Sequence, residues 1–345
     1  MADKGFSHLH LHTQYSLLDG AISFDRLFKR CQQLGMDSVA MTDHGNMFGA
    51  VEFYTAAQKT GVKPILGIEA YIAPDSRFEK QKGGGVKENA YHLLLLAENN
   101  TGYKNLMKLS SIGYTEGFYY RPRIDKEVLA QFNEGLICTS ACIAGEVPVQ
   151  LLQGGEEAAR RTIEQYLTIF GSERFFVEIQ EHESNEHPQL GQMLADLAQR
   201  MGVGVVATND VHFLEAEDYK AHNVLCCIST GKKVNDPDRM VYPPDVYLKS
   251  PDEMRQLFPY APHACDMTLE IAKRCNVELD LKTRHAPKYT PADGSTPEDY
   301  LSRLVYEGAK RQYGTVTPEI RERIERELEV ISGKGFASYF LIVWD

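Results

Sequence analysis

The chain has 345 residues, of which 43% are hydrophobic and 25% are charged, a composition that is typical of a folded globular protein and excludes a disordered tail, a collagen-like rod and a disulfide miniprotein. Its formal net charge of −11 excludes a general duplex-DNA binder with a basic surface, because such a surface must neutralise the phosphate backbone. The absence of a signal-peptide stretch or a long apolar run, and seven cysteines without framework spacing, predict a cytoplasmic protein with reduced thiols and no membrane span.

Short β-rich runs alternate with amphipathic helical stretches as far as about Thr208, which predicts an α/β fold with a largely parallel sheet. Seven runs have this character: 6–12, 38–42, 64–72, 92–97, 136–139, 175–179 and 203–208. Helices are predicted between the first two runs, with Gly35 as a C-cap, and over 156–170 and 189–201. A series this long favours a seven-stranded (β/α) barrel over an open sheet, and barrels carry their chemistry at the carboxyl ends of the strands.

A glycine-rich stretch at 80–87, KQKGGGVK, is predicted to be a loop. It lacks the Walker pattern, in which a glycine, four intervening residues and then Gly-Lys-Ser or Gly-Lys-Thr follow one another. A phosphate-binding role is therefore not expected for it.

The character of the sequence changes after about Pro251, where strand patterns fade and helices take over. Thr296 and Thr317 each precede Pro and Glu, which is a helix N-terminal signature, and each is followed by an apolar stripe. We therefore expect a first domain over 1–279 and a helical segment over 280–345. The sequence stops just after an apolar run, YFLIVW at 339–344, which indicates either a piece cut from a longer protein or a terminal segment docked on the body.

Histidines alternate in the first predicted strand, where His8, His10 and His12 should point to one face. A lone buried histidine is usually structural, but His-x-His at the end of a strand is a recurring metal-ligand spacing. The pattern therefore predicts a metal site at this strand.

Other strand ends supply further carboxylates and imidazoles, which are listed here in chain order: Asp43, His44, Glu69, Asp210 and His212. Taken singly, Asp43 and Asp210 are also explained as helix N-caps or turn residues. The whole set converges only if the strands form one sheet or barrel.

Ordered motifs along the chain carry a family resemblance: HLHLHT, SLLDG, TDHGNMFG, ILGIEAY, ENAYHLLLLA, TSACIAGEV and TNDVH. They resemble the polymerase and histidinol phosphatase (PHP) domain at the N-terminus of the bacterial replicative DNA polymerase III alpha subunit. Two later motifs, VYLKSPDEM and GFASYFLIVWD, continue the resemblance toward the polymerase palm. The resemblance implies a distorted barrel of PHP type in a DNA-directed DNA polymerase. It also places the palm carboxylates beyond this chain, so no polymerase activity is expected from it.

The resemblance carries the metal-binding positions of the family onto nine residues: His10, His12, Asp19, His44, Glu69, His92, Cys142, Asp210 and His212. It implies three divalent ions. Imidazole and thiolate donors favour zinc or manganese, with iron possible, over magnesium. His8 falls outside the set and is expected to orient a ligand or a bound water.

Two of these positions have a structural alternative. His92 starts its run, whereas simple barrel logic expects a ligand where a run ends. Cys142 has the alternative of a small buried apolar side chain, as free cysteines often are.

A cluster of this kind predicts phosphoester hydrolysis, with His10, His12, Asp210 and His212 catalytic through bound metal and hydroxide. Arg121, Arg123 and His182, with Tyr120, are predicted to contact a second phosphate or a base, the alternative being solvated loops.

The resemblance implies 3′–5′ exonuclease proofreading on a single strand or primer terminus, at replication forks in the bacterial cytoplasm and beside other polymerase III subunits. The alternatives are a metal-stabilised scaffold that docks a separate proofreading exonuclease subunit, and a general phosphatase.

Overall fold

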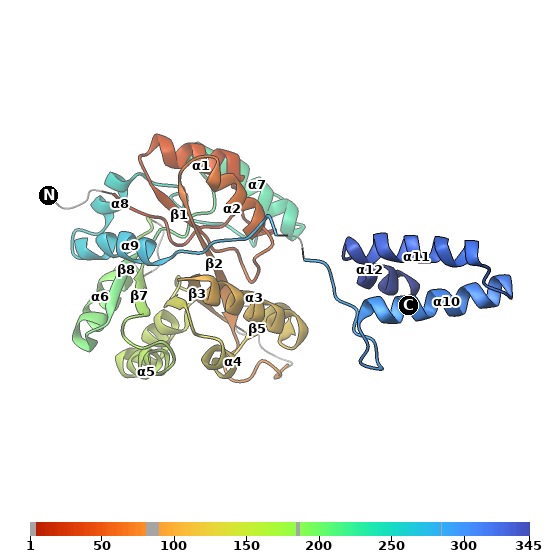
Figure 1. Ribbon diagram of the computed structural model, residues 1–345. Helices are drawn as coiled ribbons and strands as arrows, with labels where there is room; N and C mark the ends of the chain where they lie inside the picture. The colour runs from red at the N-terminus through yellow and green to blue at the C-terminus, as the bar shows by residue number, and fades with distance from the viewer. Residues whose placement is uncertain (1–4, 81–89, 184–186, 284) are drawn as a thin grey trace. The chain divides into compact units, whose positions relative to one another are not determined.

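A computed structural model describes residues 5–80, 90–183, 187–283 and 285–345, and the chain divides into two compact units, Met1–Leu279 and Asp280–Asp345 (Figure 1). Residues 81–87 of the predicted glycine-rich loop lie outside the described part. Within the described residues, no helix combines the length and the apolar character that a membrane crossing requires.

The first unit is built on a curled sheet with the strand order β4-β5-β2-β3-β6-β7-β8, and β1 pairs with β2. The strands are β1 Ser38–Met41, β2 Lys63–Ile72, β3 Tyr91–Ala97, β4 Phe118–Tyr119, β5 Arg121–Ile124, β6 Leu136–Thr139, β7 Phe175–Ile179 and β8 Gly204–Ala207. Most pairs are parallel, but β3 is antiparallel to both β2 and β6. The last six predicted runs are therefore strands. The short β4 and β5 were not predicted, because FY and RPRI show no clear apolar alternation.

The first predicted run, 6–12, is not a continuous strand. It makes isolated parallel bridges to both sides, His8 with Val39 of β1 and Leu11 with Val211 after β8. Backbone hydrogen bonds reinforce both contacts, from Ala40 N to the His8 carbonyl and from His12 N to the Val211 carbonyl. The segment thus joins the two sides of the curled sheet and completes the predicted distorted barrel.

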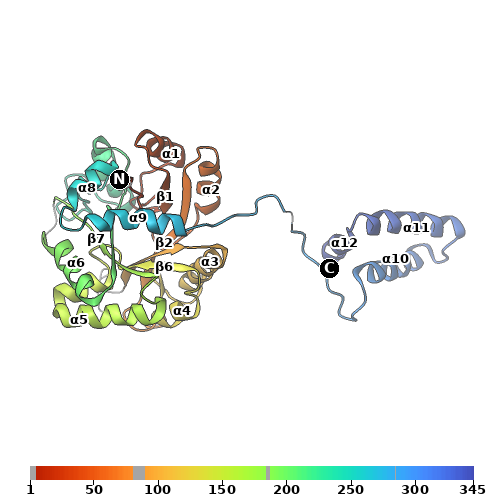
Figure 2. The ribbon, with the colours of Figure 1, turned by 60° about the vertical axis from the view of Figure 1, so that its left-hand side comes forward.

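Helices pack around the outside of this barrel (Figure 2). They are α1 Phe24–Gln33, α2 Ala50–Gln58, α3 Asn100–Thr115, α4 Lys126–Gln131, α5 Glu146–Phe170, α6 Leu190–Met201, α7 Tyr219–Thr230, α8 Pro251–Leu257 and α9 Pro262–Arg274. The α1 helix lies between the first two runs, as predicted, and buries Leu27, Phe28 and Cys31. Its C-cap is Leu34, and Gly35, the predicted C-cap, follows one residue later with a φ of +67°. The α5 helix begins ten residues before the predicted start at 156 and is kinked at Gly155, whose φ is +76°.

The β3 strand shows how the core is divided. Leu93 and Leu95 pack outward against a cluster that includes Leu106 and Leu109 of α3. Leu94 and Leu96 point the other way, into a second cluster inside the barrel, because successive strand residues face opposite sides. The barrel interior is therefore filled with apolar side chains, and polar chemistry is left to its rim.

The second unit consists of helices α10 Pro297–Tyr313, α11 Pro318–Gly333 and α12 Ala337–Trp344. The predicted caps are confirmed, since the Thr296 and Thr317 side chains accept hydrogen bonds from backbone N–H groups of the first turns. Leu301 of α10 packs with Ala337 and Leu341 of α12 in a small apolar core. The run predicted as either a cut end or a docked segment is thus a helix with one side packed within its unit.

Candidate metal centre

The structure brings all nine predicted ligands to the rim at one end of the barrel. His44 follows β1, Glu69 lies in β2, Cys142 follows β6, and Asp210 and His212 follow β8. The position of His92 follows from strand direction: β3 runs antiparallel to its neighbours, so its first residues lie beside the carboxyl ends of β2 and β6. A residue that begins a run therefore reaches the same rim as residues that end one.

Glu69 is the central carboxylate of this group and is fully buried. Its Oε1 lies 3.2 Å from His10 Nε2 and 2.8 Å from His92 Nδ1, and its Oε2 lies 2.5 Å from His44 Nδ1. Cys142 Sγ approaches the same place, 3.5 Å from His92 Nδ1. One carboxylate thus faces three imidazoles through both of its oxygens, an arrangement suited to bridging two cations.

Asp210 and Asp19 provide the other two carboxylates. Asp210 Oδ1 lies 3.2 Å from His10 Nε2 and 3.1 Å from His12 Nε2. Asp19 Oδ1 lies 3.4 Å from His44 Nε2. Asp210 has a φ of +47°, which an L-residue adopts at a conformational cost. The backbone is therefore held in a disfavoured conformation where it presents this carboxylate.

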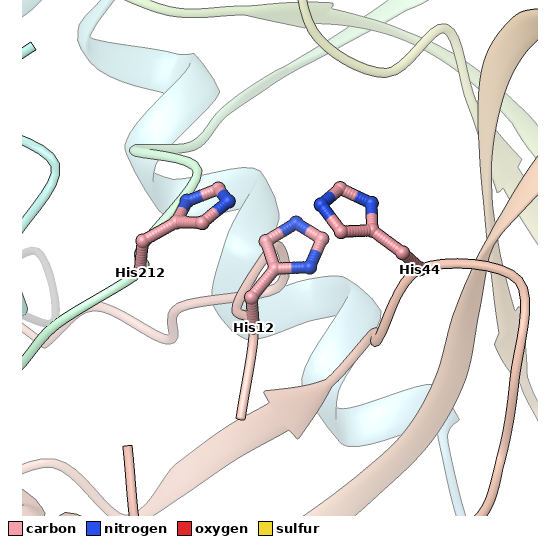
Figure 3. A group of neighbouring side chains, drawn as sticks. All are labelled: His12, His44 and His212. Carbon is pink, nitrogen blue, oxygen red and sulfur yellow. The ribbon is translucent and has the colours of Figure 1, made fainter. Parts of the chain in front are cut away.

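Three imidazoles converge from separate parts of the chain (Figure 3). The ring centroids of His12 and His44 are 4.0 Å apart, and those of His12 and His212 are 4.3 Å apart. These three histidines, the group His10, His12 and Glu69, and the group His44, Glu69 and His92 each offer ligand atoms within 4.8 Å of one another. The spacing fits coordination of several ions by shared side chains.

Buried polar atoms without a hydrogen-bond partner test whether the residues fit a metal. Seven of the nine predicted ligands provide one: His10 Nε2, His12 Nε2, Asp19 Oδ1, His44 Nδ1, Glu69 Oε2, Asp210 Oδ1 and His212 Nε2. Most of these atoms lie within ion-pair distance of another ligand atom, but without the geometry of a hydrogen bond. Burying a polar atom without a partner costs free energy, and coordinated cations would satisfy all of these atoms at once. The donor set therefore fits divalent metal ions.

Hydrogen bonds at the other ring nitrogen orient three of these imidazoles. His10 Nδ1 lies 2.7 Å from Glu178 Oε1, and His212 Nδ1 lies 2.8 Å from the Asp210 carbonyl. His12 Nδ1 donates to Ser16 Oγ at 3.0 Å, because that hydroxyl donates to Asp43 at 2.7 Å. Each acceptor places the proton on Nδ1 and leaves the lone pair of Nε2 directed at the centre.

Electrostatics agree with this assignment at His12. Burial, together with the neighbouring His44 and His212, lowers the pKa of His12 to about 3, so its imidazole is a neutral lone-pair donor. Against the opposing effect of burial, neighbouring carboxylates raise the pKa of His10 and of His44, and a bound cation would offset that effect. Burial, and then the Glu69 and Asp210 carboxylates, raise the pKa of the Cys142 thiol. A bound cation reverses the effect on the Cys142 thiol, because it stabilises a thiolate.

Three supporting residues were not among the predicted site residues, namely Ser16, Glu178 and Tyr242, and a fourth, Asp43, was predicted at a strand end but not as a ligand. Glu178 is buried in β7 and bonds His10, Thr139 and Thr208, while Tyr242 donates to Asp19 Oδ2 at 2.9 Å. Asp43, for which an N-cap was the alternative, instead accepts bonds from Thr13 and Ser16. Of these residues, Glu178 had a signal in the sequence, because it is an ionisable residue inside the apolar run FFVEI, as Glu69 is inside its own apolar run.

The remaining predicted residues have different surroundings. His8 donates from Nε2 to the Lys249 carbonyl at 2.8 Å, so it supports the segment after 245 and not a ligand directly. Arg123 is 3% exposed and donates to the backbone carbonyls of Gly117, Arg77 and Glu79, which makes it a structural residue instead of the predicted substrate contact.

Two cavities flank the centre. One, of about 230 Å³, is lined by Cys142, Glu178 and His182 together with apolar residues of α6. The other, of about 360 Å³, is lined by Asp19, His44, Tyr120 and Arg121 among others. His182 and Arg121 therefore lie in separate cavities on either side of the predicted ligands.

Two family models match the chain. The PHP domain matches residues 8–182, and the bacterial DNA polymerase III alpha NTPase domain matches residues 299–345. The chain is 46% identical to the DNA polymerase III subunit alpha of Treponema pallidum, 43% to that of Borreliella burgdorferi and 39% to that of Thermus aquaticus. These matches cover 99–100% of the chain, which spans 30–33% of the length of these relatives.

Solved structures are more distant. An amidohydrolase from Chromobacterium violaceum has a TM-score of 0.41 and 14% identity, over 60% of this chain and 88% of that one. A two-domain protein from Bacteroides vulgatus, described as containing a predicted PHP-like metal-dependent phosphoesterase, has a TM-score of 0.39 and 12% identity, over 81% of this chain and 72% of that one.

Proposed function

The chain belongs to the PHP domain family, and we propose that its barrel is a metal-dependent phosphoesterase that removes nucleotides from DNA 3′ ends as part of a replicative polymerase. The observation that supports this proposal is the convergence of nine predicted ligands, seven of which have a buried polar atom without a hydrogen-bond partner. A group held only for packing would satisfy these atoms within the protein.

We assign the nine side chains to three divalent ions, zinc or manganese, with iron as a further candidate. The mixture of imidazole, carboxylate and thiol donors supports these metals over magnesium. Ions bound here would supply Lewis acidity toward phosphoryl oxygens and lower the pKa of water. Glu69 would help to hold these ions from the middle of the group, and His10, His12, Asp210 and His212 would be the ligands that act on the phosphate through them.

The chain's own residues also prepare the site for substrate. Glu178 and Ser16 fix the orientation of His10 and His12, so the ligands are positioned before binding. The Arg121 guanidinium lies 4.7 Å from the centre of the Tyr71 ring, at the edge of the larger cavity, and supplies a cation for a second phosphate. His182 lines the smaller cavity, where its imidazole would contact a phosphate or a base.

The second candidate is a metal-stabilised scaffold that docks a separate exonuclease subunit beside the polymerase. The net charge of −11 favours it, because an acidic surface repels DNA outside a local site. We further propose that this chain works within a longer protein like these relatives. DNA-directed polymerisation and contacts with other replicase subunits would be functions of that longer protein.

Hydrolysis separates these candidates. The purified chain, loaded with manganese or zinc, is assayed on bis(p-nitrophenyl) phosphate and on a 3′-labelled oligonucleotide. The variants His12→Ala and Asp210→Asn should lose at least about 100-fold in rate, because they remove a ligand and with it the charge that stabilises the transition state. His263→Ala changes an exposed histidine of α9 and serves as the matched control.

Circular dichroism must first show that each variant is folded. A folded, metal-loaded wild type that is no faster than the His12→Ala and Asp210→Asn variants on every phosphodiester and phosphomonoester tried would refute the enzyme. The scaffold would then be the function that remains.

A further inference from the structure

The larger cavity is a cleft that opens directly beside the metal centre. Asp19 and His44, two of the predicted ligands, form part of its wall, and its volume is about 360 Å³. The remainder of the wall includes five aromatic residues, together with apolar and small polar residues and one cation from Arg121. A molecule that fills this cleft is therefore in contact with the metal centre at one end and with aromatic rings at the other.

A row of three exposed aromatic rings lines the cleft. The ring centroids of Phe48 and Tyr114 are 6.0 Å apart, and those of Tyr114 and Phe118 are 6.2 Å apart. All three side chains are exposed, and Phe48 is 58% exposed. A contiguous exposed aromatic surface is unfavourable in water unless something covers it, so the row indicates a ligand with flat apolar faces.

Tyr120 adds a fourth ring at the turn between β4 and β5. It is 63% exposed and has a φ of +59°, a conformation that tyrosine rarely adopts. The pairing of β5 with β2 holds this turn in place. Among the described residues, the other non-glycine positions with positive φ are Ala141 and Asp210, one beside Cys142 and the other itself a predicted ligand. Disfavoured backbone conformations thus gather around one site, as they do at binding sites.

We propose that this aromatic cleft binds the unpaired bases of single-stranded nucleic acid next to the phosphodiester at the metal centre. The inference rests on the proposed phosphoesterase function and names the part of the site that binds the bases. Every base has a π face that stacks on an aromatic ring, whereas the bases of a duplex are already stacked on one another. Arg121 supplies the one cation needed for a neighbouring phosphate.

The charge of the protein gives this proposal a distinctive signature. Most nucleic-acid binders neutralise many phosphates and lose affinity steeply as salt rises. With a net charge of −11 and one arginine in the cleft, binding here must depend on stacking. We therefore expect the logarithm of the affinity to fall with the logarithm of the salt concentration with a slope of about 0.7, which is the contribution of one neutralised phosphate on a single strand.

The test measures binding and small-substrate hydrolysis side by side on the full chain. Fluorescence anisotropy measures the binding of a fluorescein-labelled oligothymidylate of ten nucleotides with phosphorothioate linkages, in a buffer that contains manganese. The double variant Phe48→Ala/Phe118→Ala and the variant Tyr120→Gly should each weaken binding by about tenfold or more. Tyr120→Gly also relieves the positive φ, so it should not unfold the protein. In Phe48→Ala/Phe118→Ala, hydrolysis of bis(p-nitrophenyl) phosphate should stay within about twofold, because this substrate has only two small rings, whereas the oligothymidylate stacks several bases along the row.

Phe78→Ala is the matched control, because Phe78 is 57% exposed and is not part of the cleft wall. Oligothymidylate binding that is unchanged in both cleft variants would overturn the proposal. So would duplex DNA that binds as tightly as the single strand. Loss of binding to another polymerase subunit, with oligothymidylate binding intact, would show that the row is a protein-docking surface instead.

The two proposals fail separately in this design. A wild type that does not hydrolyse bis(p-nitrophenyl) phosphate, but whose oligothymidylate binding depends on the rings, refutes the enzyme and supports the base-binding cleft.

Discussion

The substitution Glu178→Gln tests whether metal binding depends on a residue that is not itself a predicted ligand but forms a hydrogen bond to one. Glu178 Oε1 accepts bonds from His10 Nδ1 at 2.7 Å, Gln180 Nε2 at 2.9 Å and Thr208 Oγ1 at 2.5 Å, and Oε2 accepts from Thr139. Glutamine keeps the shape and one oxygen for the first three donors. Its amide nitrogen then faces the Thr139 hydroxyl, which can rotate and accept.

The expected cost to folding is therefore small, about 1 kcal/mol, the net value of one hydrogen bond. The effect on metal binding is larger, because the negative charge that makes His10 Nε2 a stronger donor is lost. Removing such a supporting carboxylate weakens metal affinity by about 10- to 100-fold, or about 1.4–2.7 kcal/mol. The charge therefore matters more to the metal centre than to the fold.

The assay is competition for manganese or zinc against a chromophoric chelator at pH 7.5, with circular dichroism to show that the variant is folded. Glu181→Gln is the control, because Glu181 lies three residues further along the chain and bonds Tyr260 instead of a predicted ligand. A folded Glu178→Gln protein that binds metal within about threefold of wild type would refute the reasoning. An equal loss in Glu181→Gln would show that the effect is not specific to His10.

Four further predictions concern stability and metal binding. Chelation should lower the melting temperature by several degrees and added metal should restore it, since one site at a free metal concentration of 100 Kd contributes about 2.7 kcal/mol; an unchanged calorimetric scan would contradict this. Gly20→Ala should weaken metal binding, because its Cβ would lie 1.8 Å from the Thr13 carbonyl in the loop that carries Asp19. Gly308→Ala, in α10 with open space around it, should raise the free energy of unfolding, measured by urea titration, by up to about 1 kcal/mol. Burial raises the pKa of Cys31 to about 12, so the folded state keeps a proton that the unfolded thiol releases from about pH 8.5, and stability should fall from pH 9 toward 12, less steeply in Cys31→Ala.

Much of the centre was predictable because its signals are local. His10 and His12 share a face through strand alternation, and His44 and Asp210 directly follow apolar runs, so their rim position follows from the barrel itself. The resemblance added Asp19, His92 and Cys142, which spacing alone did not assign.

Strand pairing could not be predicted from local sequence patterns. The antiparallel direction of β3, which brings His92 to the same rim as Glu69, depends on long-range hydrogen bonds that a run of leucines does not specify. For the same reason 6–12 reads as a strand, yet it forms only single bridges where it joins β1 to Val211.

The sequence by itself determined the kinds of ligand, their order along the chain and the α/β class, because residue chemistry and periodicity are properties of short segments. Only the tertiary structure decided which side chains face the centre and which support it. Glu178 reaches His10 across 168 positions of sequence, and Arg123 turns inward to three carbonyl groups while Arg121 faces the aromatic cleft. These choices depend on which segments pack together, because a buried polar group must find its partner wherever the fold places one.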